Sequence, residues 1–199
     1  MNKKDNRNMH ILNFIYTKTE EKKRLLDIYD EYQWFLDNNF PVILPKFYAS
    51  LYKKCGGDKK LFAREASREL DKIYASDIYR QKFFKIKDNW RGIEAEVFDA
   101  LKKLKLKAEN KYICNISLYG PEGQFQRPNI INLRANAKKD IRTANETIVH
   151  ELIHLLIYNK VKRMKLSYEK TEGLVDSFFT KVELKRIFPR YKKQSIIKY

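Results

Sequence analysis

Apolar side chains in the first half of the chain recur every three or four residues, which is the spacing of an α-helix. The first such series is Leu25, Tyr29, Tyr32 and Leu36. Thr17 stands before this series with Glu20 three residues later, and such a pair forms a capping box at a helix start. We therefore predict a first helix that runs to about Asn38.

The next helices are separated by glycine and aspartate. A short helix from Lys46 is expected to end at Gly56-Gly57, because glycine readily takes the left-handed conformation of a helix end. Asp58 can cap the following helix, which we predict to continue, with one interruption, to Trp90. A last series in this half predicts a further helix, and its members are Ile93, Val97, Leu101 and Leu104.

Short segments rich in β-branched and aromatic residues predict strands. Residues 10–16 form a candidate strand, although apolar and polar positions alternate poorly there. The pattern changes after residue 107. Residues 111–119 and 129–133 predict two more strands, separated by a turn at 120–123 that contains two glycines and a proline. These two strands could form a hairpin that covers the next helix, or could place an edge strand beside a cleft.

Residues 143–159 predict a buried helix. Thr143 and Glu146 have the spacing of a second capping box, and Asn159 can end the helix in a left-handed conformation. The residues from Ile148 to Tyr158 are apolar on nearly every face, as in a helix packed on all sides. A polar side chain inside such a helix needs a partner, because an unpaired buried polar group costs about 1–3 kcal/mol.

The composition fits a folded α+β protein. Of the 199 residues 43% are hydrophobic and 14% aromatic, which is enough to bury a core. We expect a mainly helical N-terminal extension at 1–90 and a second domain at 91–199, which can pack as one unit. No uncharged apolar run is long enough for a membrane span. Without a signal segment or a cysteine pairing pattern, a soluble cytoplasmic protein with reduced Cys55 and Cys114 is expected.

The formal net charge of +17 predicts attraction to polyanions such as nucleic acid, anionic membrane surfaces or acidic proteins. The charge is distributed along the chain, with basic residues at Lys160, Lys162, Arg163 and Lys165 and more in the range 181–199. A solvated, lysine-rich surface explains the same charge equally well. No nucleic-acid-binding motif accompanies it, which weakens the binding interpretation.

Two of the three histidines stand four residues apart around a glutamate, in the series His150-Glu151-Leu152-Ile153-His154. On a helix this spacing puts both imidazoles on one face, where a single zinc ion can bind both. Glu151 is then placed to act as general base on a water molecule at the metal. The third histidine, His10, is expected to be a packing or surface residue.

A catalytic zinc ion usually has three protein ligands. No histidine follows His154, so the third ligand must come from an acid or a tyrosine, and the next segment offers Glu169, Glu172 and Asp176. Glu172 and Asp176 lie four residues apart and share a helix face. Glu172 can therefore bind the metal while Asp176 accepts the ring N–H of a ligating histidine. Glu169 is the competing ligand.

The two motifs together resemble the gluzincin, or thermolysin-like, zinc metallopeptidases, whose second motif has the pattern Asn-Glu-x-x-Ser-Asp. Here the second motif is Thr171-Glu172-Gly173-Leu174-Val175-Asp176, so Thr171 and Val175 depart from the pattern but both acids keep their spacing. The resemblance covers residues 143–176. It implies that Glu172 is the third zinc ligand and that Asp176 supports a zinc-bound histidine. Choosing Glu169 would put Gly173 where that supporting acid belongs, so we prefer Glu172.

The resemblance implies a zincin-like domain at 91–199, in which a small sheet packs on an active-site helix and a glutamate helix. The expected function is a Zn²⁺-dependent metallopeptidase acting on peptide or protein substrates, which an edge strand could bind by strand addition. Tyr158 and Tyr168 are candidate oxyanion donors. The alternatives are a non-proteolytic zinc-containing module that binds nucleic acid or protein through its basic surface, a peptidase inhibited by its own N-terminal part or tail, and an inactive relative used for protein interaction.

Overall fold

The computed structural model describes residues 11–194, and within them the chain forms eight helices and a four-stranded mixed sheet. This confirms the predicted α+β class. His10 lies outside the described residues. The helices are α1 (Lys18–Asp37), α2 (Tyr48–Cys55), α3 (Lys59–Ile73), α4 (Ser76–Arg91), α5 (Glu94–Lys103), α6 (Lys138–Met164), α7 (Tyr168–Phe179) and α8 (Val182–Ile187); the strands are β1 (Ile11–Ile15), β2 (Lys111–Ser117), β3 (Gly123–Gln126) and β4 (Ile130–Arg134).

The sheet has the order β1-β2-β4-β3, with β1, β2 and β4 parallel and β3 antiparallel at one edge. The two strands predicted at 111–119 and 129–133 are therefore not a hairpin. They pair in parallel, with Ile113 opposite Ile130. The hairpin is instead formed by β3 and β4, where Phe125 lies opposite Ile131. The sequence Gly-Gln-Phe-Gln of β3 lacks the β-branched residues that reveal a strand.

Most predicted helix ends in the first half are confirmed. The Thr17 side chain accepts the backbone N–H of Glu20, and the Asp58 side chain accepts that of Leu61. Gly56 ends α2 in the left-handed conformation with a φ of 54°. The predicted interruption before Trp90 is the break between α3 and α4.

The ends of α6 differ from the prediction. The helix begins at Lys138, where the Asp140 carboxylate accepts the backbone N–H groups of Asn136 and Ala137. Thr143 lies inside the helix, and its hydroxyl donates to the carbonyl of Lys139. The helix continues past Asn159 to a left-handed Lys165. The buried acid Asp140, which also pairs with Arg134 at 3.0 Å, provides an earlier start than the predicted capping box.

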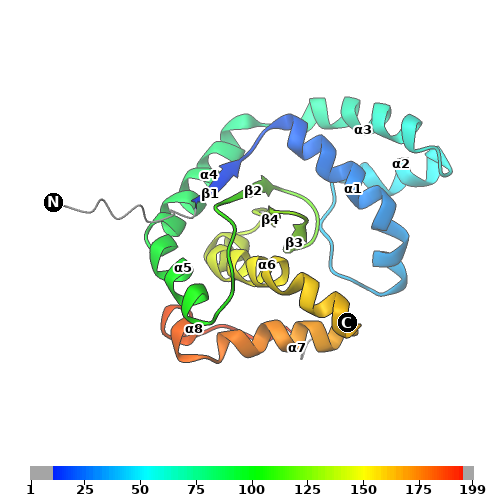
Figure 1. The fold of residues 1–199 in the computed structure, drawn as a ribbon. Coiled ribbons are helices and arrows are strands. Elements are labelled where there is room, and N and C mark those ends of the chain that lie inside the picture. Colours follow the sequence, from blue (N-terminus) through cyan, green and yellow to red (C-terminus); the bar gives the residue numbers. More distant parts are fainter. Residues whose placement is uncertain (1–10, 195–199) are drawn as a thin grey trace.

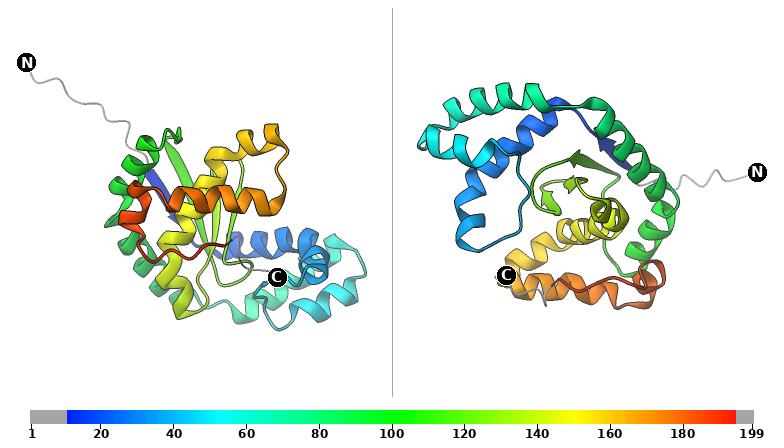
Figure 2. Two further views of the ribbon diagram at one scale, coloured as in Figure 1. Left: turned by 90° about the horizontal axis from the view of Figure 1, so that it is seen from below. Right: turned by 180° about the vertical axis from the view of Figure 1, so that it is seen from behind.

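The helices surround the small sheet (Figure 1). Helices α1–α3 lie to one side, α4 and α5 to the other, and α7 runs beside α6; Figure 2 shows the same arrangement from below and from behind. Helix α6 packs against β3, β4, α4 and α7. This packing buries the part of α6 that was predicted to be apolar on nearly every face, including Ile148 and Ile153.

Two apolar clusters hold these layers together. The larger cluster joins strands β1, β2 and β4 to helices α4, α5, α6, α7 and α8. The smaller cluster joins α1, α2 and α3. Strand β1 and helix α4, which belong to the predicted N-terminal part, thus share a core with residues 91–199. The division of the chain into two domains at residue 90 stays a prediction. Cys55 and Cys114 are free and buried, one in each cluster.

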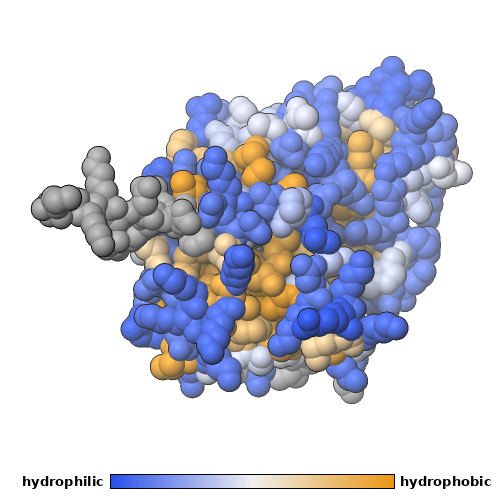
Figure 3. Space-filling view, viewed as in Figure 1, coloured by the Kyte–Doolittle hydropathy of each residue, from blue (hydrophilic) through white to orange (hydrophobic). Residues whose placement is uncertain are grey.

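The visible surface is mainly hydrophilic, with hydrophobic side chains gathered near the centre of the face seen in Figure 3. None of the helices in the range 11–194 combines the length and the apolar character that crossing a membrane requires.

Candidate metal centre

Two helices supply the predicted site. Helix α6 carries His150, Glu151 and His154, and α7 carries Glu172 and Asp176. Ser167 caps the start of α7, and its side chain accepts the backbone N–H of Lys170 at 3.4 Å. Since α6 and α7 pack together, side chains one helical turn apart on each helix can meet in the space between them.

The ring nitrogens of the two histidines point at each other and at Glu172. The Nε2 atoms of His150 and His154 are 3.0 Å apart. Oε2 of Glu172 lies 3.1 Å from the first and Oε1 lies 3.2 Å from the second. The three residues are 1%, 6% and 6% exposed. Three ligating groups therefore converge on one buried point.

Glu169, the competing acid, is exposed and does not join this group. It lies in the first turn of α7 and one turn before Glu172. The structure thus brings together the three residues that the sequence motifs singled out, His150, His154 and Glu172. They form a group that could hold a metal ion.

The chemistry of the three groups fits a divalent cation. Two imidazole nitrogens at 3.0 Å cannot both carry a proton in the space between them, so at least one presents a lone pair there. Burial opposes charge on Glu172, but hydrogen bonds with His150 and His154 outweigh it and lower the pKa of this carboxyl to about 2. An ionised carboxylate and two imidazoles are a ligand set that zinc accepts.

Glu151 lies beside the first histidine and is 8% exposed. Burial raises the pKa of its carboxyl, partly offset by the nearby histidines. The edge strand β3 passes very close to it. A Cβ atom added to Gly123 would lie 2.6 Å from Oε1 of Glu151 and 2.6 Å from Cγ2 of Thr147, so only glycine permits this approach without a shift.

Strand β3 also contacts the centre and the N-terminal helices. The Phe125 ring stacks on the His154 ring with centroids 5.2 Å apart. The buried Arg24 of α1 donates a hydrogen bond to Oε1 of Gln124, and Gln124 donates to Glu31. These contacts were not predicted from the sequence, because β3 carries no pattern that marks it as a strand or as part of a site.

Tyr191 is a second residue that the sequence analysis missed. Its hydroxyl lies 2.8 Å from Nδ1 of His150 and donates to Oδ1 of Asp176 at 2.7 Å. The contact that was predicted between Asp176 and a histidine ring therefore runs through a tyrosine hydroxyl. The residue follows α8 in an irregular segment, where no helical or strand spacing marks it.

Of the two tyrosines predicted as oxyanion donors, Tyr158 lies in the C-terminal half of α6 and Tyr168 is the first residue of α7. The Arg127 guanidinium lies 4.4 Å from the centroid of the Tyr158 ring, and Phe125 packs against the same ring. Tyr168 is 53% exposed. A catalytic role for either hydroxyl stays a prediction.

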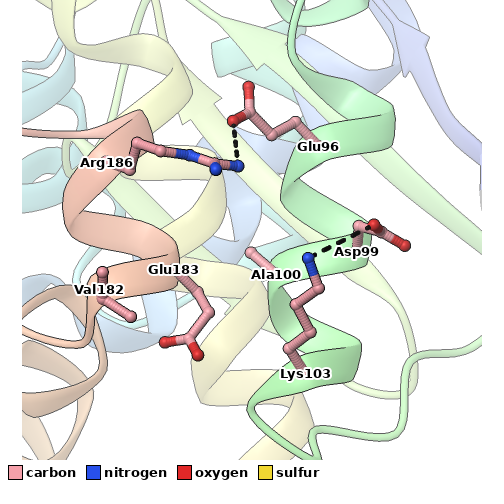
Figure 4. Close-up of a pocket in the computed structure, with 7 residues that line it drawn as sticks. All are labelled: Glu96, Asp99, Ala100, Lys103, Val182, Glu183 and Arg186. Carbon is pink, nitrogen blue, oxygen red and sulfur yellow. Dashed lines mark hydrogen bonds and ion pairs between the residues drawn. The ribbon is translucent and has the colours of Figure 1, made fainter.

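A separate hollow of about 240 Å³ lies between α5 and α8 (Figure 4). Its charged side chains largely pair with one another, as Arg186 does with Glu96 at 2.9 Å and Lys103 with Asp99 at 3.9 Å. They do not converge on a common point as the histidines and Glu172 do. This hollow therefore does not compete with the metal centre as the chemical site.

No protein-family model, curated protein or solved structure matches this chain. The residues of the candidate centre and their geometry are therefore what indicates a function.

Proposed function

We propose that this protein is a zinc metallopeptidase of the gluzincin type. The observation that carries the proposal is the buried convergence of His150, His154 and Glu172, with Glu151 next to the first histidine. The fold supports it, because a small sheet with an antiparallel edge strand packs on the histidine helix and the glutamate helix lies beside it. A zincin-like domain is expected to have this arrangement.

His150, His154 and Glu172 would hold the zinc ion. When bound, zinc lowers the pKa of a water molecule towards about 7 and polarises a carbonyl oxygen. Glu151 takes a proton from the attacking water and returns it to the leaving amine, as a general base and then a general acid. The burial that raises the pKa of Glu151 suits a group that must both accept and release a proton near neutral pH.

Strand β3 is the element best placed to hold the substrate. It is an edge strand, so a peptide in extended conformation can add to it through backbone hydrogen bonds. Gly123 brings the strand into contact with Glu151, and Phe125 brings it against His154. A peptide paired with β3 would thus lie across the metal centre. The buried, free cysteines fit a cytoplasmic setting, which we include in the proposal.

The test is a zinc measurement followed by cleavage of a mixed peptide library. Wild-type protein is expected to bind one zinc ion per chain and to cleave peptides. Glu151→Gln is expected to keep the zinc and to lose about 10²- to 10⁴-fold in rate, the usual contribution of a general base. Glu146→Gln, one and a half turns earlier on α6, is the matched control. Unchanged cleavage by Glu151→Gln would remove the proposed mechanism.

A second function is favoured by the charge of the chain. Its net charge is +17, and Lys160, Lys162, Arg163 and Lys165 are all exposed at the end of α6. A zinc-containing module that binds nucleic acid without cleaving peptides would use such a surface. Affinity for DNA or RNA that falls steeply with salt, together with an inactive peptide assay, would support this function over the first.

A further inference from the structure

The chain after α8 turns back beside α7 (Figure 2), and its Tyr191 side chain contacts His150 of the candidate metal centre. Tyr191 is the contact point. Its ring lies flat on the ring of Phe179, with centroids 3.6 Å apart and an angle of 3° between the planes. Phe179 belongs to the larger apolar cluster. The position of the tyrosine ring is thus fixed by packing, independently of its hydroxyl.

The hydrogen bonds of this hydroxyl have only one consistent direction. An ionised Asp176 can only accept, so the Tyr191 O–H donates to Oδ1 at 2.7 Å. With its single proton used, the oxygen can only accept from His150, whose Nδ1 lies 2.8 Å away. Nδ1 must then carry a ring proton, so in the neutral imidazole, which is the form that binds a metal ion, Nε2 presents its lone pair towards His154 and Glu172.

The carboxylate at the far end is itself held in place. Asp176 is 2% exposed, and the backbone N–H of Gln194 donates to the same Oδ1 at 3.2 Å. Two donors from the C-terminal segment 189–194 therefore converge on one oxygen. The segment orients the acid, the acid orients the hydroxyl, and the hydroxyl orients the histidine.

We propose that Tyr191 is a positioning residue of the metal centre, which sets the tautomer and ring orientation of His150 and so makes segment 189–194 part of the site. The proposal rests on the metal centre proposed above. It differs from the sequence expectation, in which an acid alone supports a ligating histidine. Removing a partner of this kind typically lowers metal affinity about 10- to 100-fold.

The test compares Tyr191→Phe with Tyr48→Phe by competition for zinc with a chromophoric chelator. Tyr191→Phe keeps the ring on Phe179 and removes only the hydroxyl, so the zinc Kd is expected to rise about 10- to 100-fold. Tyr48 is the matched control, because its buried hydroxyl donates to the carbonyl of Leu25 at 2.9 Å, within the cluster of α1–α3. Its loss should leave the zinc Kd unchanged. Equal zinc Kd values for wild type and Tyr191→Phe would overturn the proposal.

A second measurement needs only the wild-type protein. Nitrogen-15 NMR of zinc-loaded wild type should show a slowly exchanging proton on Nδ1 of one zinc-bound histidine. Zinc-loaded wild type without such a proton would contradict the assigned tautomer even if the variant failed to fold.

The outcomes separate this inference from the peptidase proposal. Weaker zinc binding by Tyr191→Phe, in a protein that cleaves no peptide, would support the role of Tyr191 and remove the peptidase function. Peptide cleavage by wild type, together with an unchanged zinc Kd in Tyr191→Phe, would support the peptidase function and remove the proposed role of Tyr191. Wild type that fails to bind zinc would remove both.

Discussion

Gly123 is the residue whose missing side chain shapes the centre most directly. Its backbone lies against Glu151 and Thr147. No sequence pattern distinguishes it from the turn glycine at position 120. Its importance follows from the approach of an edge strand to a helix, which is a property of the fold.

Gly123→Ala is expected to lower kcat/KM about 10²-fold while zinc content stays at the wild-type level. The added Cβ would lie 2.6 Å from Oε1 of Glu151, so the acid or the strand must move by a distance on the order of 1 Å, and such a displacement can have an effect of this size. Gly173→Ala is the control, because a Cβ there meets nothing within 4 Å. An unchanged kcat/KM in Gly123→Ala would show that Glu151 needs no exact position.

At the scale of elements, the faces of α6 and α7 determine which side chains meet. His150 and His154 share a face of α6, and Glu172 and Asp176 share a face of α7. The four-residue spacing is visible in the sequence because each pair lies on one helix. This spacing singled out His150, His154 and Glu172, which the structure brings together as a group that could hold a metal ion.

The two acids of α7 allow a direct test of this geometry. Glu172→Ala is expected to lose bound zinc on dialysis, because it removes one of three ligands. Glu169→Ala, one turn earlier and exposed, should retain it. The measurement is the metal content of both dialysed variants. Zinc loss confined to Glu169→Ala would show that the ligand is misassigned.

Contacts between elements that are distant in sequence could not be predicted. Strand β3 has too few β-branched residues to be recognised, and its role depends on pairing with β4. The predicted ends of α6 were wrong. The buried Asp140 caps the start of the helix, where Thr143 was expected to do so, and the left-handed Lys165 ends it, where Asn159 was expected to. Tyr191 reaches His150 only after the chain has turned back from α8. Local spacing contains none of this information.

At the scale of the whole molecule, two buried charged residues of α1 attach the N-terminal helices to the rest. Glu21 is 1% exposed and accepts a hydrogen bond from Ser117 of β2 at 2.9 Å. Arg24 reaches the turn before β3, where a Cβ on Gly120 would lie 2.7 Å from its Nη2 atom. Helix α1 is therefore joined by polar contacts to β2, through Glu21, and to β3, through Arg24 and Gln124.

Glu21 should give the protein a pH-dependent stability. Burial raises the pKa of this carboxyl from 4.5 to about 7, opposed in part by the hydrogen bond from Ser117. A raised folded-state pKa favours the protonated form, so its contribution is present below pH 4.5 and is lost as the pH rises through 7. The loss amounts to up to about 3 kcal/mol, at 1.36 kcal/mol for each pKa unit.

The free energy of unfolding of the wild type should decrease between pH 5 and pH 8, and Glu21→Gln is expected to make this decrease smaller by up to about 3 kcal/mol. Urea unfolding at both pH values measures the difference. Asp37→Asn, an exposed acid at the end of the same helix, should keep the wild-type profile. Parallel profiles for wild type and Glu21→Gln would contradict this account.

The close approach of the two imidazoles to Glu172 has a consequence for handling the protein. Burial opposes a charge on His154, but Glu172 outweighs it and raises the pKa of the ring. In the proposed centre, protons and a metal ion would therefore compete for the same nitrogen, and loading the centre would release acid into the buffer. Dialysis in mildly acidic solution is expected to strip the ion more readily than dialysis at alkaline pH, so storage conditions would decide which form of the protein reaches the assay.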